Sequence, residues 1–281
     1  MNPGSIRALV TGGAGGIGGA IAAELLQRGS SVLLVDRDQA ALARSAERFA
    51  RYGERVGTLA ADLTSPADRK RICVDAAAWR GGVNVLVNNA GINHFQMFEN
   101  QPPEQLDLAL AINVQAPLHL CHGLLPHLRR QPEACILNTG SVFGAIGYPG
   151  YAVYSATKFA IRGFTEALRR ELADTNVRVY YVAPRATRTG INTSAVERMN
   201  AELGVAMDPP ELVAKAVCDM LAGGRLEAVL GWPEKLFARV NGVLPRVVDG
   251  ALRKQLPVIR RYAGAPATAT GTTLQSTRTP T

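Results

Sequence analysis

Residues 8–36, ALVTGGAGGIGGAIAAELLQRGSSVLLVD, contain two apolar segments that flank a glycine-rich turn and an alanine- and leucine-rich stretch. This order predicts a β-strand, a tight turn, an α-helix and a second strand, which together outline a dinucleotide site. Gly12, Gly16 and Gly18 let the backbone turn tightly and approach a pyrophosphate at the unpaired N–H groups of the helix N-terminus. A flexible turn without a ligand is the alternative interpretation.

Asp36 ends the second apolar segment. A carboxylate at the end of this strand can bond both hydroxyls of an adenosine ribose and repel a 2′-phosphate, which favours NAD over NADP. Two alternatives stay open. Arg37 could meet a 2′-phosphate, and Asp36 could simply cap the next helix.

Apolar strands and helices alternate through the following residues. The sequence predicts further strands at 56–60, 83–91, 134–141 and 226–230, with helices at 39–52, 66–79, 104–129 and 211–221. Continuous Val, Leu and Ile runs separated by helices indicate an α/β fold, a parallel sheet covered on both faces.

A second informative stretch is SVFGAIGYPGYAVYSATK, residues 141–158. Helical spacing places Tyr154 and Lys158 on one face. We expect the ammonium of Lys158 to lower the pKa of Tyr154 and to make it a general acid and base. Ser141 could hold a carbonyl oxygen against that hydroxyl. Taken alone, Tyr-x-x-x-Lys is more often an ordinary surface pair.

Length and composition predict one large globular domain, because the chain has 281 residues and is 47% hydrophobic. No apolar run approaches the length of a spanning helix, and the N-terminus lacks a signal-peptide pattern. The four cysteines show no metal or disulfide spacing, so we expect a cytoplasmic protein with reduced thiols. His119 and His122 lack a third ligand at metal spacing, so no metal site is expected.

The net charge of +8 is concentrated between residues 225 and 262, which hold eight Lys or Arg and three Asp or Glu. No nucleic-acid module accompanies it. Apolar residues recur near helical spacing in 232–263, which predicts two or three short amphipathic helices broken at Pro245 and Pro257. They would cover the substrate cleft or a subunit interface, or contact an anionic membrane surface. Either arrangement favours a lipophilic substrate.

The chain thus divides into a dinucleotide-binding and catalytic part, 1–231, a helical extension, 232–263, and a predicted disordered Thr/Ala/Pro-rich tail, 264–281. Residues 189–207 form a lid-like stretch beside the expected substrate region.

A set of motifs then recurs in order between Arg7 and Gly231. They are Thr11-Gly12-x-x-x-Gly16-x-Gly18, Asp62, Asn88-Asn89-Ala90-Gly91, Asn113, Ser141, Tyr154-x-x-x-Lys158, and Pro184 followed by Thr189. On these motifs the chain resembles the short-chain dehydrogenase/reductase family. The resemblance implies a Rossmann-type, doubly wound sheet of about seven parallel strands that binds NAD(P) at the carboxyl ends of its strands.

The resemblance also implies roles for individual residues. Tyr154 would exchange a proton with the substrate oxygen that Ser141 orients, Lys158 would bond the nicotinamide ribose, and Asn113 would hold a relay water. The expected cofactor-binding residues are Thr11, Gly12, Gly16, Ile17, Gly18, Asp36, Asp62, Leu63, Asn89, Ala90, Gly91, Tyr154, Lys158, Pro184 and Thr189. Asn88 would join them at the adenosine ribose.

Two positions depart from the family pattern. Arg185 follows Pro184 where glycine is usual, so its side chain could alter the loop under the nicotinamide or point to solvent. Gly140 precedes Ser141 where a second serine is common.

The sequence therefore predicts an oxidoreductase that transfers a hydride between NAD(H) and a secondary alcohol or ketone, with a lipophilic, steroid-like or 3-oxoacyl substrate. An NADPH-dependent 3-oxoacyl-thioester reductase is the enzymatic alternative, and a dinucleotide-binding redox sensor or scaffold is the non-enzymatic one. The resemblance implies a homo-oligomer, either a dimer or a tetramer.

Overall fold

The structure is a computed structural model, and it describes residues 1–264. Seven strands form one sheet in the order β3-β2-β1-β4-β5-β6-β7. Their bounds are β1 Arg7–Thr11, β2 Ser31–Asp36, β3 Val56–Ala60, β4 Val85–Asn88, β5 Ala134–Thr139, β6 Val177–Ala183 and β7 Glu227–Val229. Every pair of neighbouring strands is parallel, which confirms the predicted Rossmann-type sheet.

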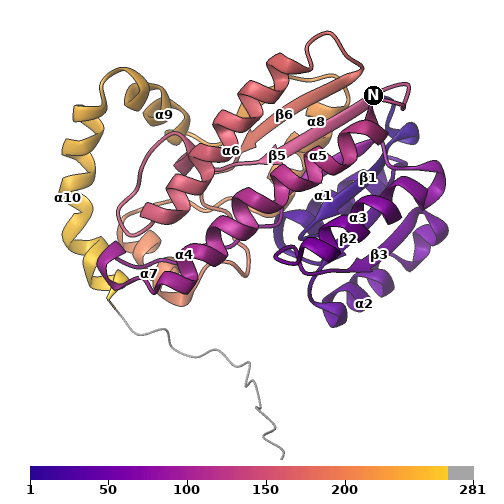
Figure 1. Cartoon of the computed structure of the whole chain (residues 1–281). Coiled ribbons are helices and arrows are strands. Elements are labelled where there is room, and N and C mark those ends of the chain that lie inside the picture. The colour runs from indigo at the N-terminus through magenta and orange to yellow at the C-terminus, as the bar shows by residue number, and fades with distance from the viewer. Residues whose placement is uncertain (265–281) are drawn as a thin grey trace, which may run out of the picture.

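Helices cover both faces of this sheet (Figure 1). They are α1 Gly16–Gln27, α2 Gln39–Arg48, α3 Pro66–Ala78, α4 Pro103–Leu110, α5 Ala116–Leu128, α6 Ala152–Glu171, α7 Ser194–Glu202, α8 Pro210–Leu221, α9 Glu234–Val243 and α10 Pro245–Ala263. In β1, Ala8 and Val10 pack with α1, α2 and α8, whereas Leu9 packs on the opposite face with α3, α5 and α6. Strands buried on both faces need continuous apolar runs, which is why the sequence reveals them.

The strand order reverses beside β1, since β2 and β3 extend the sheet on one side and β4 to β7 on the other. All seven strands run in the same direction, so their carboxyl ends share one edge. Ligands of this sheet class bind where the order reverses at that edge. The turn after β1 and the loop after β4 meet there.

The predicted helix 104–129 consists of α4, a π-helical turn η5 Ala111–Gln115, and α5. This joined helix, Pro103–Leu128, is long and apolar enough in an 18-residue window to cross a membrane, although no apolar run of that length was expected from the sequence. Leu124 and Leu128 of α5 are fully buried against the sheet. A core helix of a globular domain passes the same test, so we assign it to the core.

The extension after β7 forms two helices, α9 and α10. Pro245 begins α10, but Pro257 lies inside α10, so the expected break at Pro257 is wrong. An interior proline costs about 3 kcal/mol. Val248 and Ile259 of α10 are buried, and burying one such side chain stabilises the fold by about 1.5–3 kcal/mol. Packing on the domain therefore offsets the cost. The segment expected to be disordered, 264–281, lies outside the described residues except for Gly264.

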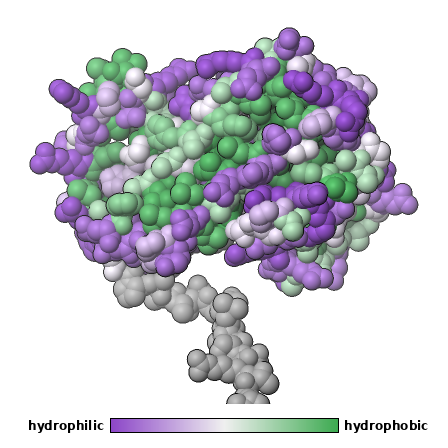
Figure 2. Space-filling model, viewed as in Figure 1, coloured by the Kyte–Doolittle hydropathy of each residue, from purple (hydrophilic) through white to green (hydrophobic). Residues whose placement is uncertain are grey.

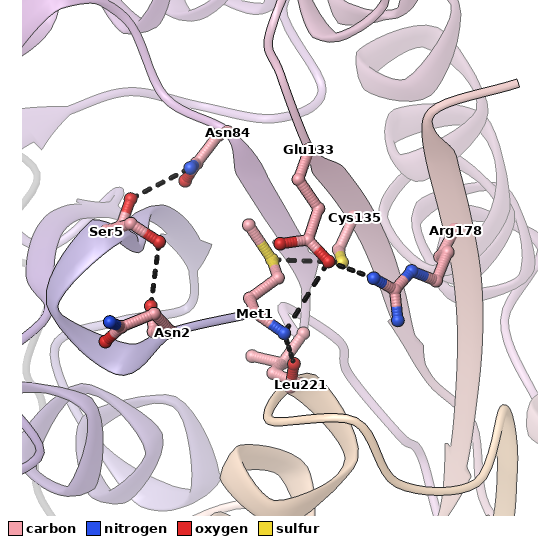
Figure 3. Close-up of polar contacts among 8 residues, drawn as sticks. All are labelled: Met1, Asn2, Ser5, Asn84, Glu133, Cys135, Arg178 and Leu221. Atoms are coloured by element: carbon pink, nitrogen blue, oxygen red, sulfur yellow. Dashed lines mark hydrogen bonds and ion pairs between the residues drawn. The ribbon is translucent and has the colours of Figure 1, made fainter.

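Polar contacts fix the opposite edge of the sheet, where the strands begin (Figure 3). The amino group of Met1 donates to the carbonyl oxygen of Leu221 at 3.0 Å and lies 3.6 Å from Oε1 of Glu133. Glu133 also pairs with Arg178 of β6. Asn84 donates to the carbonyl oxygen of Ser5 at 2.9 Å. These contacts join the segments that precede β1, β4 and β5 to β6 and α8, far from the carboxyl edge.

Candidate active site

The glycine-rich turn after β1 lets the backbone approach a ligand closely. Gly12 and Gly16 have φ of +64° and +54°, a region in which side chains are strained. A Cβ at Gly18 would overlap the carbonyl oxygen of Gly12, so α1 can lie against the turn only with glycine there. Gly15 precedes α1 without a side-chain cap, and the first turn holds no acidic residue. The N–H groups of this helix start are thus suited to an anion.

A cavity of about 670 Å³ opens along the carboxyl ends of the strands. The predicted residues that line it are Gly12, Gly16, Ile17, Asp36, Asn89, Ala90, Gly91, Ser141, Tyr154, Lys158, Pro184 and Thr189. The predicted residues outside its lining are Thr11, Gly18, Asp62, Leu63, Asn88 and Asn113. The fold therefore brings most of the predicted residues, from six separate segments, to one cavity.

Thr11 joins the loop after β4 to the glycine-rich turn. Its Oγ1 accepts hydrogen bonds from the backbone N–H groups of Asn89 at 3.0 Å and Ala90 at 3.1 Å. Its carbonyl oxygen accepts a third from Asn89 Nδ2 at 3.1 Å. Thr11 is buried behind the cavity wall, so it positions Asn89 and Ala90, and the predicted direct contact with a cofactor is not what this geometry favours.

Asp36 lies at the rim of the cavity, beside the glycine-rich turn. Its Oδ2 accepts a hydrogen bond from the N–H of Ala14 at 3.3 Å, and its Oδ1 accepts one from the N–H of Asp38 at 3.2 Å. The residue that caps α2 is Asp38, whose side chain accepts from the N–H of Ala41. The alternative that Asp36 caps this helix is therefore wrong, and its carboxylate is oriented toward the turn.

Ser141, Tyr154 and Lys158 meet at the middle of the cavity. Ser141 follows β5, and its Oγ accepts a hydrogen bond from the N–H of Phe143 at 3.1 Å. Tyr154 and Lys158 are one turn apart in α6, with Lys158 Nζ 5.5 Å from the centre of the Tyr154 ring. Lys158 Nζ donates to the carbonyl oxygen of Thr139 at 3.0 Å. The predicted common face of Tyr154 and Lys158 is thus observed.

Burial controls the proton affinities of this pair. It raises the pKa of Tyr154 to about 12, and a hydrogen bond with Ser141 acts in the opposite direction. Burial lowers the pKa of Lys158 to about 8. The predicted lowering of the Tyr154 pKa is therefore wrong for this structure, because desolvation of the phenolate outweighs the opposing hydrogen bond with Ser141. The ammonium of Lys158 is hydrogen-bonded to the carbonyl oxygen of Thr139. Tyr154 is a protonated phenol at neutral pH.

Asn113 lies in the π-helical turn η5 and is buried. Its Oδ1 accepts a hydrogen bond from the N–H of Ile92 at 2.9 Å, and its Nδ2 donates to the carbonyl oxygen of Ile92 at 2.8 Å. Nδ2 also lies 3.1 Å from Thr157 Oγ1 in α6. Asn113 therefore fixes the loop after Gly91 against α6, as functional π turns often do. Its role in a proton relay remains a prediction.

Asn88 and Asp62 have other partners. Asn88 is buried, and its Nδ2 donates to Asn138 Oδ1 at 2.8 Å and to Cys121 Sγ at 3.3 Å. This buried link between β4 and β5 does not support the predicted ribose contact of Asn88. Asp62 is exposed, and its Oδ1 accepts two hydrogen bonds from Thr64. The predicted cofactor contacts of Asp62 and Leu63 stay predictions.

Aromatic rings form the cavity wall around Tyr154. The rings of Phe143 and Tyr148 stack with centres 4.8 Å apart, and Tyr151 lies 6.0 Å from Tyr154. The hydroxyl of Tyr148 donates to Oε1 of Gln255 in α10 at 3.1 Å. The extension thus completes this wall. Sequence reasoning missed Gln255, because it lies 107 positions from its partner and no local pattern marks it.

The segment between β6 and α8 lines the cavity, and it contains residues 189–207, the stretch that the sequence predicts to be lid-like. A Cβ on Gly16 would lie 3.5 Å from the side chain of Thr189, so this segment reaches the glycine-rich turn. Val196 and Met199 of α7 line the cavity and are buried in one cluster with Ile259 of α10. α7 therefore lines the cavity and packs against α10 of the extension.

Arg185 does not point to solvent, so that alternative is wrong. Its Nε and Nη2 donate to the two carboxylate oxygens of Asp208 at 2.9 and 2.6 Å. Nη1 donates to the carbonyl oxygen of Trp232 at 3.0 Å and to Glu234 at 3.4 Å. A buried bidentate pair of this kind is geometrically specific. Arg185 thus joins the loop after β6 to Asp208 in the loop before α8 and to the start of α9.

Gly140, the second departure, has a steric cause. A Cβ at Gly140 would overlap the hydroxyl of Tyr181, which is buried in β6. Tyr181 therefore occupies the space that a second serine would need. The hydroxyl of Tyr181 lies 3.5 Å from the carbonyl oxygen of Ser141, so it supports the backbone of the site.

A doubly wound sheet with this glycine-rich turn and a Ser, Tyr and Lys at one cavity defines a Rossmann-type oxidoreductase. The family model described as short chain dehydrogenase matches residues 7–200, and the chain belongs to that family. Over 261 residues it is 29% identical to the putative oxidoreductase SadH of Mycobacterium tuberculosis, covering 88% of this chain and 92% of SadH.

Two further relatives have named activities. The chain is 32% identical to D-beta-hydroxybutyrate dehydrogenase of Cupriavidus necator, over 72% of this chain and 78% of that protein. It is 33% identical to 3alpha-hydroxysteroid dehydrogenase of Mediterraneibacter gnavus, over 65% of this chain and 74% of that protein.

Solved structures share the fold. A short chain dehydrogenase/reductase from Burkholderia phymatum in complex with NAD superposes with a TM-score of 0.79 at 22% identity, over 88% of this chain and 96% of that one. One from Burkholderia cenocepacia in complex with NADP gives 0.76 at 26% identity, over 90% and 99%.

Proposed function

We propose that this protein interconverts a secondary alcohol and a ketone with NAD(H), on an apolar substrate. The observation that carries the proposal is the meeting of Ser141, Tyr154 and Lys158 with the glycine-rich turn at one cavity lined by aromatic side chains. Relatives named for hydroxybutyrate and hydroxysteroid oxidation support chemistry at a CH–OH group.

The turn and its surroundings fit a dinucleotide. Backbone N–H groups at the start of α1 face an anion site, and the side chains that line this end of the cavity are small. Asn89 and Ala90 lie directly against Gly12, and with Gly91 they also line this cavity. When bound, the nicotinamide supplies or accepts the hydride, so the protein has only to bind, orient and move a proton.

Tyr154 moves that proton. In reduction, its phenolic O–H donates to the carbonyl oxygen of the substrate, and in oxidation the phenolate accepts the proton of the alcohol. Ser141 orients the substrate oxygen against Tyr154. Lys158 is in place to hold ribose hydroxyls, with its position fixed by Thr139. Burial raises the pKa of Tyr154, so at neutral pH it is in the protonated form that carbonyl reduction uses.

The cavity supports an apolar substrate larger than a short alcohol. Phe143, Tyr148 and Tyr151 line it together with Val196 and Met199 of α7, and these side chains pack in one apolar cluster. The cavity of about 670 Å³ includes the end that faces the glycine-rich turn, so only its apolar part is left for the substrate. The polarity of this part suits an apolar compound such as a steroid-like or 3-oxoacyl substrate.

Asp36 supports a preference for NAD. Its carboxylate is held toward the glycine-rich turn, where a 2′-phosphate would meet a like charge. An NADPH-dependent 3-oxoacyl-thioester reductase is the second candidate, since Arg37 is exposed next to Asp36 and a related structure contains NADP.

The test is a screen of apolar ketones and secondary alcohols, followed by nicotinamide absorbance, with NAD(H) and NADP(H) in parallel. Turnover of polycyclic or long-chain carbonyl compounds with NADH supports the proposal. Turnover only of 3-oxoacyl thioesters with NADPH supports the second candidate. Tight dinucleotide binding without turnover of any of these compounds would favour the redox sensor or scaffold.

A further inference from the structure

The extension presents a concentrated apolar surface to solvent. Nearly half of the exposed large apolar side chains among residues 1–264 lie within residues 232–247, here called the apolar tip. Trp232 is 68% exposed and Val243 is 79% exposed. The other members are Leu236, Phe237, Leu244 and Val247. Figure 2 shows green apolar atoms at the upper left, where α9 turns into α10 in Figure 1, with purple polar ones beside them. Single exposed apolar residues are ordinary, whereas a group of this kind marks an interaction site.

Uncommitted positive charge lies on the two helices that carry the apolar tip, with Lys235, Arg239 and Arg246 within the tip itself. Helices α9 and α10 carry seven Lys or Arg and two Asp or Glu, and one of these acids, Glu234, pairs with Arg185. Arg261 pairs with Glu202. Within the described part of the chain, no ion pair engages the remaining basic residues, which are Lys235, Arg239, Arg246, Arg253, Lys254 and Arg260.

The combination of positive charge and exposed apolar side chains indicates which kind of partner can bind the apolar tip. A second copy seated on the tip by two-fold symmetry would bring like charges together. Nucleic acid would satisfy the charges but leave the apolar side chains unused. An anionic lipid surface offers acyl chains for the apolar side chains and phosphates for Lys and Arg, whose long stems can reach the headgroups from the same helix.

We propose that the apolar tip docks on an anionic membrane surface, with Val243, Leu244 and Trp232 in the interface and the neighbouring basic side chains on lipid phosphates. The helices lie on the membrane and do not span it. Trp232 and Phe237 also border the cavity, together with Val248 and Leu252 of α10. The cavity therefore opens beside the docked surface. Entry of an apolar substrate from the membrane into the cavity rests on the proposed function, whereas docking of the apolar tip does not.

Flotation of the protein with vesicles, without cofactor or substrate, tests docking independently of turnover. We expect binding to vesicles of phosphatidylcholine with phosphatidylglycerol, weak binding to phosphatidylcholine alone, and loss of binding as salt screens the charges. Val243→Glu should weaken binding strongly. Arg239→Gln with Arg246→Gln should weaken it by about tenfold or more. Val74→Glu is the matched control, since Val74 is 61% exposed on α3, and it should bind as wild type.

Trp232 supplies a second measurement. Its emission should shift to shorter wavelength with anionic vesicles, and the shift should be absent in Trp232→Phe. Absence of flotation at every salt concentration would overturn the proposal, as would equal loss of binding in Val74→Glu. If Val243→Glu instead dissociates an oligomer in light scattering, the tip is a contact between copies and the membrane assignment is wrong.

Discussion

Tyr154 packs among aromatic side chains, and this packing does not depend on the Tyr154 hydroxyl. The edge of the Tyr154 ring packs on Phe143, and Tyr151 lies beside it, so Tyr154→Phe keeps the cavity wall and removes only the proton carrier. We expect turnover to fall by at least ~10²–10⁴-fold, the usual contribution of acid–base catalysis, with NADH affinity nearly unchanged. Steady-state rates and NADH fluorescence titrations measure both. Tyr151→Phe is the control and should stay active; a Tyr154→Phe enzyme of wild-type rate would contradict the mechanism.

Lys158 is buried in a position that is unfavourable for its positive charge. Its pKa in the folded state is about 8, below 10.5, so the unfolded state binds more protons between these values and stability from this group rises with pH. The shift corresponds to a cost on the order of 3 kcal/mol below pH 8. We therefore expect Lys158→Met to lose activity yet to unfold at a higher temperature at pH 7, with the difference shrinking toward pH 10.

The thermal unfolding of Lys158→Met needs a control, because methionine is more hydrophobic than lysine whatever its position. Lys70→Met, at an exposed position of α3, should change the melting temperature little at any pH. A Lys158→Met variant less stable than wild type at pH 7 would show that the hydrogen bond to Thr139 outweighs the desolvation of the ammonium.

Asp36 is expected to set the cofactor preference. Asp36→Ser removes the charge opposite a 2′-phosphate and leaves Arg37 as the charged neighbour. A like-charge contact near a surface costs on the order of 1 kcal/mol or more, so the ratio of NADH to NADPH affinity should fall by about tenfold or more. Fluorescence titration of both cofactors measures this ratio. An unchanged ratio would mean that Asp36 does not face the adenosine ribose.

At the scale of residues, the sequence predicts which side chains line the cavity better than it predicts which side chains hold them in position. Gly12, Ser141, Tyr154 and Lys158 reach the cavity because their motifs fix both spacing and element. Thr11 and Asn88 were expected to contact cofactor, but both lie behind the wall in hydrogen bonds with segments distant in sequence. The pKa of Tyr154 depends on burial by the whole fold, which spacing alone does not report.

At the scale of elements, Arg185 connects three segments that no sequence pattern relates. Asp208 is nearly buried, so Arg185→Gly leaves an unpaired carboxylate, a change that typically costs 3–5 kcal/mol. We expect a large fall in melting temperature and a rise in KM for apolar substrates, because α9 and the lid segment lose their connection.

Adding Asp208→Asn to Arg185→Gly should restore part of the stability, because no buried charge then remains, but it should not restore KM. Urea unfolding and substrate saturation curves separate these two effects. Full recovery of KM in the double variant would mean that the buried charge, and not the connection between segments, disturbs the cavity.

The same scale shows why some element boundaries were wrong. Pro257 was expected to end a helix from local rules, but the burial of Ile259 and Val248 carries α10 through it. The π turn at Ala111–Gln115 has no local signal, since its sequence is an ordinary helix former between two helices. Its cause is tertiary: the two hydrogen bonds between Asn113 and Ile92.

At the scale of the molecule, the alternation of strands and helices predicted the parallel sheet, and the family resemblance implied the edge that holds the site, whereas neither predicted how the extension completes the cavity. Amphipathic spacing predicted helices in 232–263 but not the face that each would bury. That choice depends on Tyr148, Asn241 and Gln255, whose contacts join α9 and α10 to the loop before α6.

Assembly follows from the surfaces that remain exposed. Leu110, at the end of α4, and Phe159, beside Lys158 in α6, are 43% and 44% exposed. Helices around Asn113 and Tyr154 resemble those that pair subunits in this family, so we propose a dimer through this face. Phe159→Glu would place two charges within an apolar contact and should convert the dimer to a species of about 29.9 kDa. Light scattering at micromolar concentration measures this.

The apolar tip supplies the contrasting variant. Its surplus of Lys and Arg disfavours pairing with itself, so Val243→Glu should leave the mass of the dimer unchanged while it weakens vesicle binding. Phe159→Glu should do the reverse. Because Phe159 is next to Lys158, dissociation is also expected to lower turnover, whereas the membrane variant keeps it toward soluble substrates. A wild-type protein that scatters as a monomer would contradict the dimer, and a mass that falls only with Val243→Glu would move the subunit contact to the extension.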